Sequence, residues 1–167
     1  MERHDQLSFV SHLKHKKTMS LTVGQAAPAF EAKIQTGETI KLSDYLGKKV
    51  ILYFYPKDAT PGCTAQACNL RDNYDALLKA GYVVLGISSD DEKSHKKFIE
   101  KQGLPFPLIA DTDLKVHEAY GTWVEKSMYG RKYMGTARTT FVIDEKGMLA
   151  EVIEKVDTKE HTAQILK

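Results

Sequence analysis

Cysteine is scarce in this chain of 167 residues, which has only two. Long apolar runs are absent as well, since none approaches the roughly 20 residues that a membrane-spanning helix needs. A chain of this length fits one domain, which buries about 70% of its unfolded surface and needs no disulfide or metal to hold a core. The sequence therefore predicts neither a transmembrane span nor a disulfide scaffold.

An excess of one charge is also missing from most of the chain. Of 24 basic and 22 acidic residues, four and two lie in residues 1–18, which leaves 20 of each sign in the rest. Such a balance gives no electrostatic reason to bind nucleic acid or an anionic membrane. Residues 1–18 have only short apolar pieces, unlike a secretory signal. We expect an N-terminal extension there, disordered or left from cloning, ahead of a single domain over residues 19–167.

The two cysteines, Cys63 and Cys68, do not form the Cys-x-x-Cys motif of thioredoxin-like disulfide reductases. Without a predicted secretory signal, two cysteines point to a reducing compartment, so we expect a cytoplasmic protein with free, catalytic or transiently paired thiols. Their spacing also lacks the short ligand pairs of a zinc site, and no histidine nearby in the sequence completes four ligands. We therefore expect no metal.

Strand and helix patterns alternate along the chain. Near-continuous apolar runs, typical of strands covered on both faces, lie at 50–55, 82–88, 107–110, 139–143 and 148–153. Helical patterns lie at 64–79, 91–102, from 111 or 112 to 120, and over 158–167. The alternating segments 29–34 and 39–42 predict a small N-terminal hairpin. This order predicts an α/β fold whose mixed sheet is flanked by helices.

Cys63 lies where a strand, a Pro/Gly turn and a helix meet. Pro56 ends the strand, and Pro61 and Gly62 shape the turn directly before the thiol. The N–H groups of a first helical turn stabilise a thiolate, and also the negative charge that develops on an oxygen. The hydroxyl of Thr60 can orient such an oxygen. These residues predict a nucleophilic thiol that attacks a small, polar, oxygen-bearing electrophile.

Helix geometry separates Cys63 from Cys68. At ~1.5 Å and ~100° per residue, their Cα atoms would be ~8.7 Å apart and ~140° around the helix. A disulfide needs Cα atoms within about 7 Å. We expect Cys63 to face the core and Cys68 the solvent, so a bond between them requires the first turn and a half to unwind. The alternative, that both are small buried hydrophobic residues, fits the polar stripe around Cys68 poorly.

Four other residues have ordinary structural interpretations. We expect His95 and His161 to be solvated, and Tyr120 and Trp123 to lie in the core or in a pocket wall. On its own, an arginine ahead of a strand, such as Arg138, is more often a solvated charge than a catalytic group. Composition and spacing alone therefore assign none of these residues to the chemistry.

Pro56, Thr60 and Cys63 lie as in Pro-x-x-x-Thr-x-x-Cys, and this segment resembles the peroxiredoxin active-site motif. The second cysteine, Cys68, is followed by Asn-Leu-Arg-Asp, which resembles the bacterioferritin comigratory protein (PrxQ-type) subfamily. Residues 137–144 are similar to the segment that supplies the family's active-site arginine. The resemblance covers about residues 20–167.

The resemblance implies a thioredoxin-like fold and a thiol peroxidase that reduces hydrogen peroxide and organic hydroperoxides in antioxidant defence. Cys63 would be the peroxidatic thiolate, and Cys68 would resolve its sulfenic acid to an intramolecular disulfide. Thr60 would orient the thiolate and the peroxide. Arg138 would favour the thiolate and polarise the peroxide, and Pro56 would shield the pocket from water.

The resemblance also implies partners. A thioredoxin-type dithiol would reduce the disulfide, most readily at Cys68. No metal or bound organic cofactor is implied, and the subfamily is often monomeric, with a dimer as the other possibility. A second function remains open, a redox sensor or holdase that uses the same disulfide switch without fast turnover.

Overall fold

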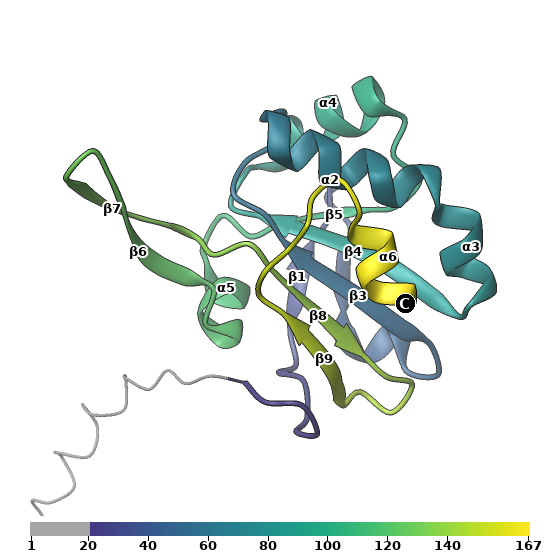
Figure 1. The fold of residues 1–167 in the computed structure, drawn as a ribbon. Helices are drawn as coiled ribbons and strands as arrows, with labels where there is room; N and C mark the ends of the chain where they lie inside the picture. Colours follow the sequence, from purple (N-terminus) through teal and green to yellow (C-terminus); the bar gives the residue numbers. More distant parts are fainter. Residues whose placement is uncertain (1–20) are drawn as a thin grey trace, which may run out of the picture.

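The computed structural model describes residues 21–167, so the extension expected over residues 1–18 lies outside the described residues (Figure 1). Its central sheet has the strand order β5-β4-β3-β8-β9. The strands are β3 (Lys49–Phe54), β4 (Tyr82–Ser88), β5 (Leu108–Ala110), β8 (Thr139–Ile143) and β9 (Leu149–Ile153). Strands β3, β4 and β5 run parallel, whereas β8 and β9 pair antiparallel. The predicted α/β fold with a mixed sheet is confirmed.

Alternation along β3 divides the core into two apolar layers. Val50, Leu52 and Phe54 pack on one side of the sheet, whereas Ile51 and Tyr53 pack on the other. The first side is covered by the predicted N-terminal hairpin, a short 3-10 helix and one α-helix, namely β1 (Glu31–Lys33), β2 (Thr39–Lys41), η1 (Leu42–Tyr45) and α5 (Lys115–Tyr120). The second is covered by α2 (Pro61–Asp72), α3 (Tyr74–Lys79), α4 (Glu92–Gln102) and α6 (His161–Leu166).

The helix predicted over 64–79 is in fact two helices. Helix α2 begins at Pro61, where a residue without an N–H is well tolerated, so Cys63 lies inside the first turn. It ends before Asn73, whose φ of −111° and ψ of 16° leave the helical region. The Asn73 side chain donates to the carbonyl of Asn69 at 2.8 Å and so competes with the helical ladder. The break separates α2 from α3.

A second hairpin, β6 (Trp123–Met128) with β7 (Arg131–Thr136), was not predicted. It projects from the body of the molecule (Figure 1) and pairs with no strand of the central sheet. Its outer residues are largely polar or exposed, so the alternation of a half-buried strand is weak. Within the described part of the chain, no helix has the length and apolar character that crossing a membrane requires.

The expectation that His95 and His161 are solvated is wrong, because both side chains are fully buried. The Nδ1 of His161 lies 2.7 Å from the Gln164 Oε1, which can only accept, so Nδ1 carries the proton. The Nε2 therefore accepts from the hydroxyl of Thr140 at 2.8 Å. Burial lowers the pKa of His161. The buried imidazole is thus a neutral link between β8 and α6.

Acidification should weaken this link. In the unfolded chain, His161 binds a proton below about pH 6.5, whereas in the folded protein its lowered pKa moves protonation to lower pH. The unfolded state therefore binds more protons in this range, and the free energy of unfolding falls as pH drops from 7 to 5. We predict that wild type loses up to about 1.4 kcal/mol per pH unit more than His161→Gln across this window. Urea unfolding at several pH values measures the difference, and parallel pH dependences would contradict it.

Candidate active site

The loop that leaves β3 delivers Cys63 to the start of α2. Thr60 is the extended N-cap residue, with φ of −82° and ψ of 156°. The first helical hydrogen bond runs from the Thr64 amide to the Thr60 carbonyl at 2.8 Å. The amides of Gly62 and Cys63 precede that bond, so they have no acceptor within the helix. The thiol, whose residue is 1% exposed, therefore lies buried at the positive end of α2.

A guanidinium contacts the thiol directly. The Nη2 of Arg138 lies 3.3 Å from the Cys63 Sγ, and the Nη1 donates to the Gln66 Oε1 at 2.7 Å. The antiparallel pairing of Phe54 with Thr139 brings the start of β8 beside the end of β3, where the Cys63 loop begins. Gly62 leaves room for the arginine, because a Cβ there would lie 3.3 Å from Nη2. These contacts fix a positive charge beside the Cys63 sulfur.

Two buried side-chain atoms in the described residues make no hydrogen bond, the Tyr53 hydroxyl and the Gln66 Nε2. Burial and then the charge of Cys63 raise the pKa of Tyr53 well above its ordinary value, so its phenol remains a donor. Gln66 lies one helical turn after Cys63. Buried donors of this kind are costly to leave unpaired.

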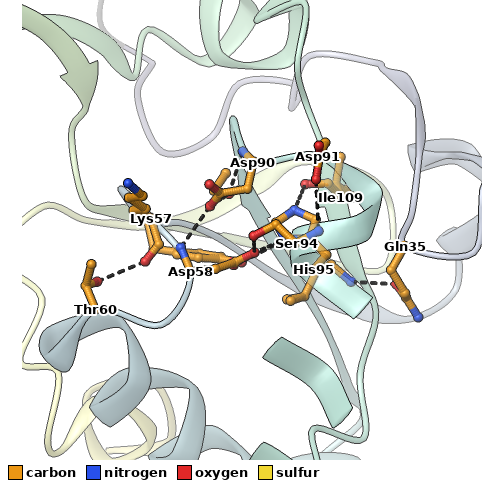
Figure 2. Close-up of polar contacts among 12 residues, drawn as sticks. Gln35, Lys57, Asp58, Thr60, Asp90, Asp91, Ser94, His95 and Ile109 are labelled. Carbon is orange, nitrogen blue, oxygen red and sulfur yellow. Dashed lines mark hydrogen bonds and ion pairs between the residues drawn. The ribbon is translucent and has the colours of Figure 1, made fainter. Parts of the chain in front are cut away.

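Thr60 and Pro56 lie on the same loop as the thiol. The Thr60 Oγ1 donates to the Lys57 carbonyl at 2.9 Å, which leaves its lone pairs free to accept from a substrate (Figure 2). Pro56 is half-buried at the start of the loop. The structure thus joins Cys63 and Arg138 by a direct contact and places Thr60 and Pro56 on the segment that leads to them.

Cys68 is half-buried against α4, whereas we expected it to face solvent. Its Sγ donates to the Gln102 Oε1 at 3.4 Å, and both cysteines are free thiols. Helix α2 holds it on a different face from the buried Cys63. The two thiols therefore have different environments, one beside a cation and the other beside a neutral amide.

Among the described residues, one cluster has side chains of metal-ligating type, Asp58, Asp90 and His95. Their ligand atoms are already hydrogen-bonded within the protein. The Asp90 Oδ2 accepts from the amide of Asp58 at 2.8 Å and from the hydroxyl of Ser88 at 2.7 Å. The His95 Nδ1 lies 2.7 Å from the Asp58 Oδ2. This cluster fits a hydrogen-bonded anchor for the loop better than a metal centre.

Sequence reasoning missed Gln66, Tyr53 and His95. Helical spacing offered a signal for Gln66, which lies three residues after Cys63. Helical spacing also indicated that His95 could be buried, because Phe98 and Gln102 follow it at three and seven residues and lie on the same face of the helix. A tyrosine in an apolar strand was a weaker signal, since a buried hydroxyl needs a partner.

Comparisons with known proteins match most of the chain. The AhpC/TSA family matches residues 23–152. Peroxiredoxin Bcp of Bacillus subtilis is 46% identical over 149 residues, covering 89% of this chain and 95% of that protein. Peroxiredoxin Bcp of Escherichia coli is 46% identical over 146 residues, covering 87% and 94%. A structure of Xanthomonas campestris bacterioferritin comigratory protein, described with alkyl peroxide reduction activity, superposes with a TM-score of 0.80 at 33% identity, covering 87% and 95%.

The anchoring of Arg138 by Gln66 gives a test of the site that assumes no substrate. We predict that Gln66→Ala slows alkylation of Cys63 by iodoacetamide about threefold to tenfold at neutral pH, because the cation loses a hydrogen bond that fixes it. Mass spectrometry in a Cys68→Ser background follows Cys63 alone. Gln35→Ala, which removes a glutamine remote from the site, serves as the control. Equal rates in both variants would show that Gln66 does not position the arginine.

Proposed function

The chain belongs to the AhpC/TSA family as a peroxiredoxin of the Bcp/PrxQ type, a thiol peroxidase, and from this premise we propose that Cys63 is the residue that reduces hydroperoxides. The predicted family and its thioredoxin-like fold are confirmed. The observation that carries the proposal is the 3.3 Å contact between the Arg138 Nη2 and the Cys63 Sγ at the start of α2.

Reduction of the peroxide begins with the Cys63 thiolate. Its sulfur attacks the terminal oxygen of the hydroperoxide, the O–O bond breaks, and the leaving alkoxide takes a proton to become an alcohol, or water when hydrogen peroxide reacts. Cys63 is oxidised to the sulfenic acid. Arg138 and the N–H groups of the first turn stabilise the negative charge that moves from sulfur to oxygen. Thr60 accepts from the peroxide O–H and orients it, and Pro56 shields the pocket from water.

Cys68 then resolves the oxidised thiol. Its sulfur displaces the hydroxyl of the sulfenic acid, so that one S–S bond forms and water is released. Intact helical geometry keeps the two Cα atoms about 8.7 Å apart, beyond the reach of a disulfide, so α2 must unwind locally for this step. The proposed cycle therefore alternates between a folded helix for peroxide attack and an open one for disulfide formation.

A thioredoxin-type dithiol completes the cycle by reducing the disulfide. Its thiolate attacks the Cys68 sulfur, which is the more exposed of the two, forms a mixed disulfide and releases Cys63. Its second thiol then displaces Cys68. The proposed enzyme acts as a monomer in a reducing, cytoplasmic setting and needs neither a metal nor an organic cofactor. A sensor or holdase with the same disulfide would differ by slow reaction with peroxide.

Two serine variants separate the assigned roles. We predict that Cys63→Ser abolishes thioredoxin-coupled peroxide consumption, whereas Cys68→Ser reduces peroxide once at the wild-type rate and then stalls. Stopped-flow kinetics measures the first step, and mass spectrometry identifies the stalled sulfenic acid and its over-oxidised products. Normal turnover by Cys63→Ser would overturn the nucleophile assignment. Normal cycling by Cys68→Ser would overturn the resolving role.

A further inference from the structure

A buried pair of side chains, Asp58 and His95, ties the loop ahead of Cys63 to α4. The Asp58 Oδ2 lies 2.7 Å from the His95 Nδ1 and 2.8 Å from the Ser94 hydroxyl, and both His95 and Ser94 belong to α4 (Figure 2). The other carboxylate oxygen of Asp58 accepts from the hydroxyl of Tyr55. His95 is fully buried, and Asp58 is only 7% exposed. The loop is therefore held to the helix by largely buried contacts.

Hydrogen bonds hold both sides of the His95 ring. The His95 Nε2 lies 2.8 Å from the carbonyl of Ile109, which can only accept, so Nε2 carries a proton. Burial acts to raise the pKa of Asp58, but the hydrogen bond and charge of His95, with those of the hydroxyls, outweigh it and keep that pKa below its usual value. The carboxylate accepts from the hydroxyls of Ser94 and Tyr55 and lies against the imidazole of His95. Both ring nitrogens of His95 therefore have a hydrogen-bond partner, Asp58 on one side and the carbonyl of Ile109 on the other.

The opposite end of α4 contacts the helix that contains Cys63. The Gln102 Oε1 accepts from the Cys68 thiol at 3.4 Å, and the backbone carbonyl of Gln102 accepts from the Nη1 of Arg71. Both partners lie on α2. Helix α4 therefore holds the reactive segment at two places, Asp58 before Cys63 and Cys68 with Arg71 after it.

Backbone strain lies inside this held segment. Ala59 has a φ of 66°, in the left-handed region that residues other than glycine rarely occupy. Such a conformation persists only where its surroundings enforce it. Here the amide of Asp58 is held by Asp90 and its side chain by α4. The contacts of Asp58 therefore hold the loop in a conformation of higher backbone energy than it would otherwise adopt.

We propose that Asp58 and His95 are positioning residues for the disulfide step, because their buried hydrogen bond fastens α4 to the segment that must open before Cys63 can reach Cys68. This inference rests on the proposed function, since it concerns the rate of one step in that cycle. The pair keeps the reduced protein in the conformation that attacks peroxide. Its strength sets how often the segment opens, and hence how the sulfenic acid divides between disulfide formation and over-oxidation by a second peroxide.

The test uses Asp58→Asn, which keeps the shape of the side chain and removes its charge. We expect disulfide formation after one equivalent of peroxide to become about tenfold faster, because a buried charge-assisted hydrogen bond is lost. We expect over-oxidation at high peroxide to fall correspondingly. In the reduced protein without peroxide, we expect amide hydrogen exchange over 57–70 to quicken about tenfold while β3 and β4 stay protected.

A matched control separates this role from general stability. Asp111→Asn removes the same kind of buried contact, since the Asp111 Oδ2 lies 2.7 Å from the Nδ1 of the buried His117, but Asp111 has no contact with the reactive loop. We expect Asp111→Asn to lower the midpoint temperature of thermal unfolding without making disulfide formation faster. If Asp58→Asn misfolds, Ser94→Ala removes one milder contact of Asp58 and should speed the step about threefold.

The outcomes distinguish this inference from the proposed function. Unchanged exchange over 57–70 in Asp58→Asn, or an equal change in disulfide rate with Asp111→Asn, would overturn the positioning role. If wild type forms no disulfide between Cys63 and Cys68, the proposed function fails, whereas the exchange measurement still decides whether α4 holds the segment. Faster exchange and faster disulfide formation in Asp58→Asn alone would support the inference.

Discussion

The contact between the Arg138 guanidinium and the Cys63 thiol is the interaction on which the rest of the site depends. It joins two segments 75 residues apart in the sequence, and the central sheet makes it possible by pairing β3 with β8. Gly62 admits the guanidinium, and Gln66 fixes its second nitrogen. A flexible arginine becomes a positioned cation because each of these contacts limits its freedom, and a thiol at a helix start thereby gains a second source of stabilisation for its anion.

The same thiol is subject to an opposing requirement. In the proposed cycle, attack on a peroxide needs α2 to be folded, whereas a bond to Cys68 needs it open. Two features of the fold would help α2 to meet both requirements. The break at Asn73 divides α2 from α3, so that unwinding of α2 need not propagate into α3. Helix α4 contacts the segment around Cys63 on both sides, through Asp58 and through Cys68, and so can set its stability separately from that of the sheet.

Much of this architecture could be predicted from the sequence. Apolar runs located the five strands of the central sheet, and the Pro-Gly turn located Cys63, because these signals are local. The residues that contact the loop before Cys63 are distant from it in the sequence. His95 reaches Asp58 and the carbonyl of Ile109 only after α4 packs on the sheet, so helical spacing could hint that His95 is buried but could not identify these partners. The projecting hairpin β6–β7 was missed for a related reason, since its strands bury little and lack clear alternation.

The central claim is that Cys63 reacts while α2 is folded and pairs with Cys68 only after α2 opens. A crystal structure of the protein oxidised by one equivalent of peroxide tests it most directly. The account predicts a disulfide between the two cysteines, loss of helix over the start of α2, separation of Cys63 from Arg138, and an unchanged sheet and α3. A disulfide within an intact Pro61–Asp72 helix, or a Cys63 paired with another molecule, would contradict it.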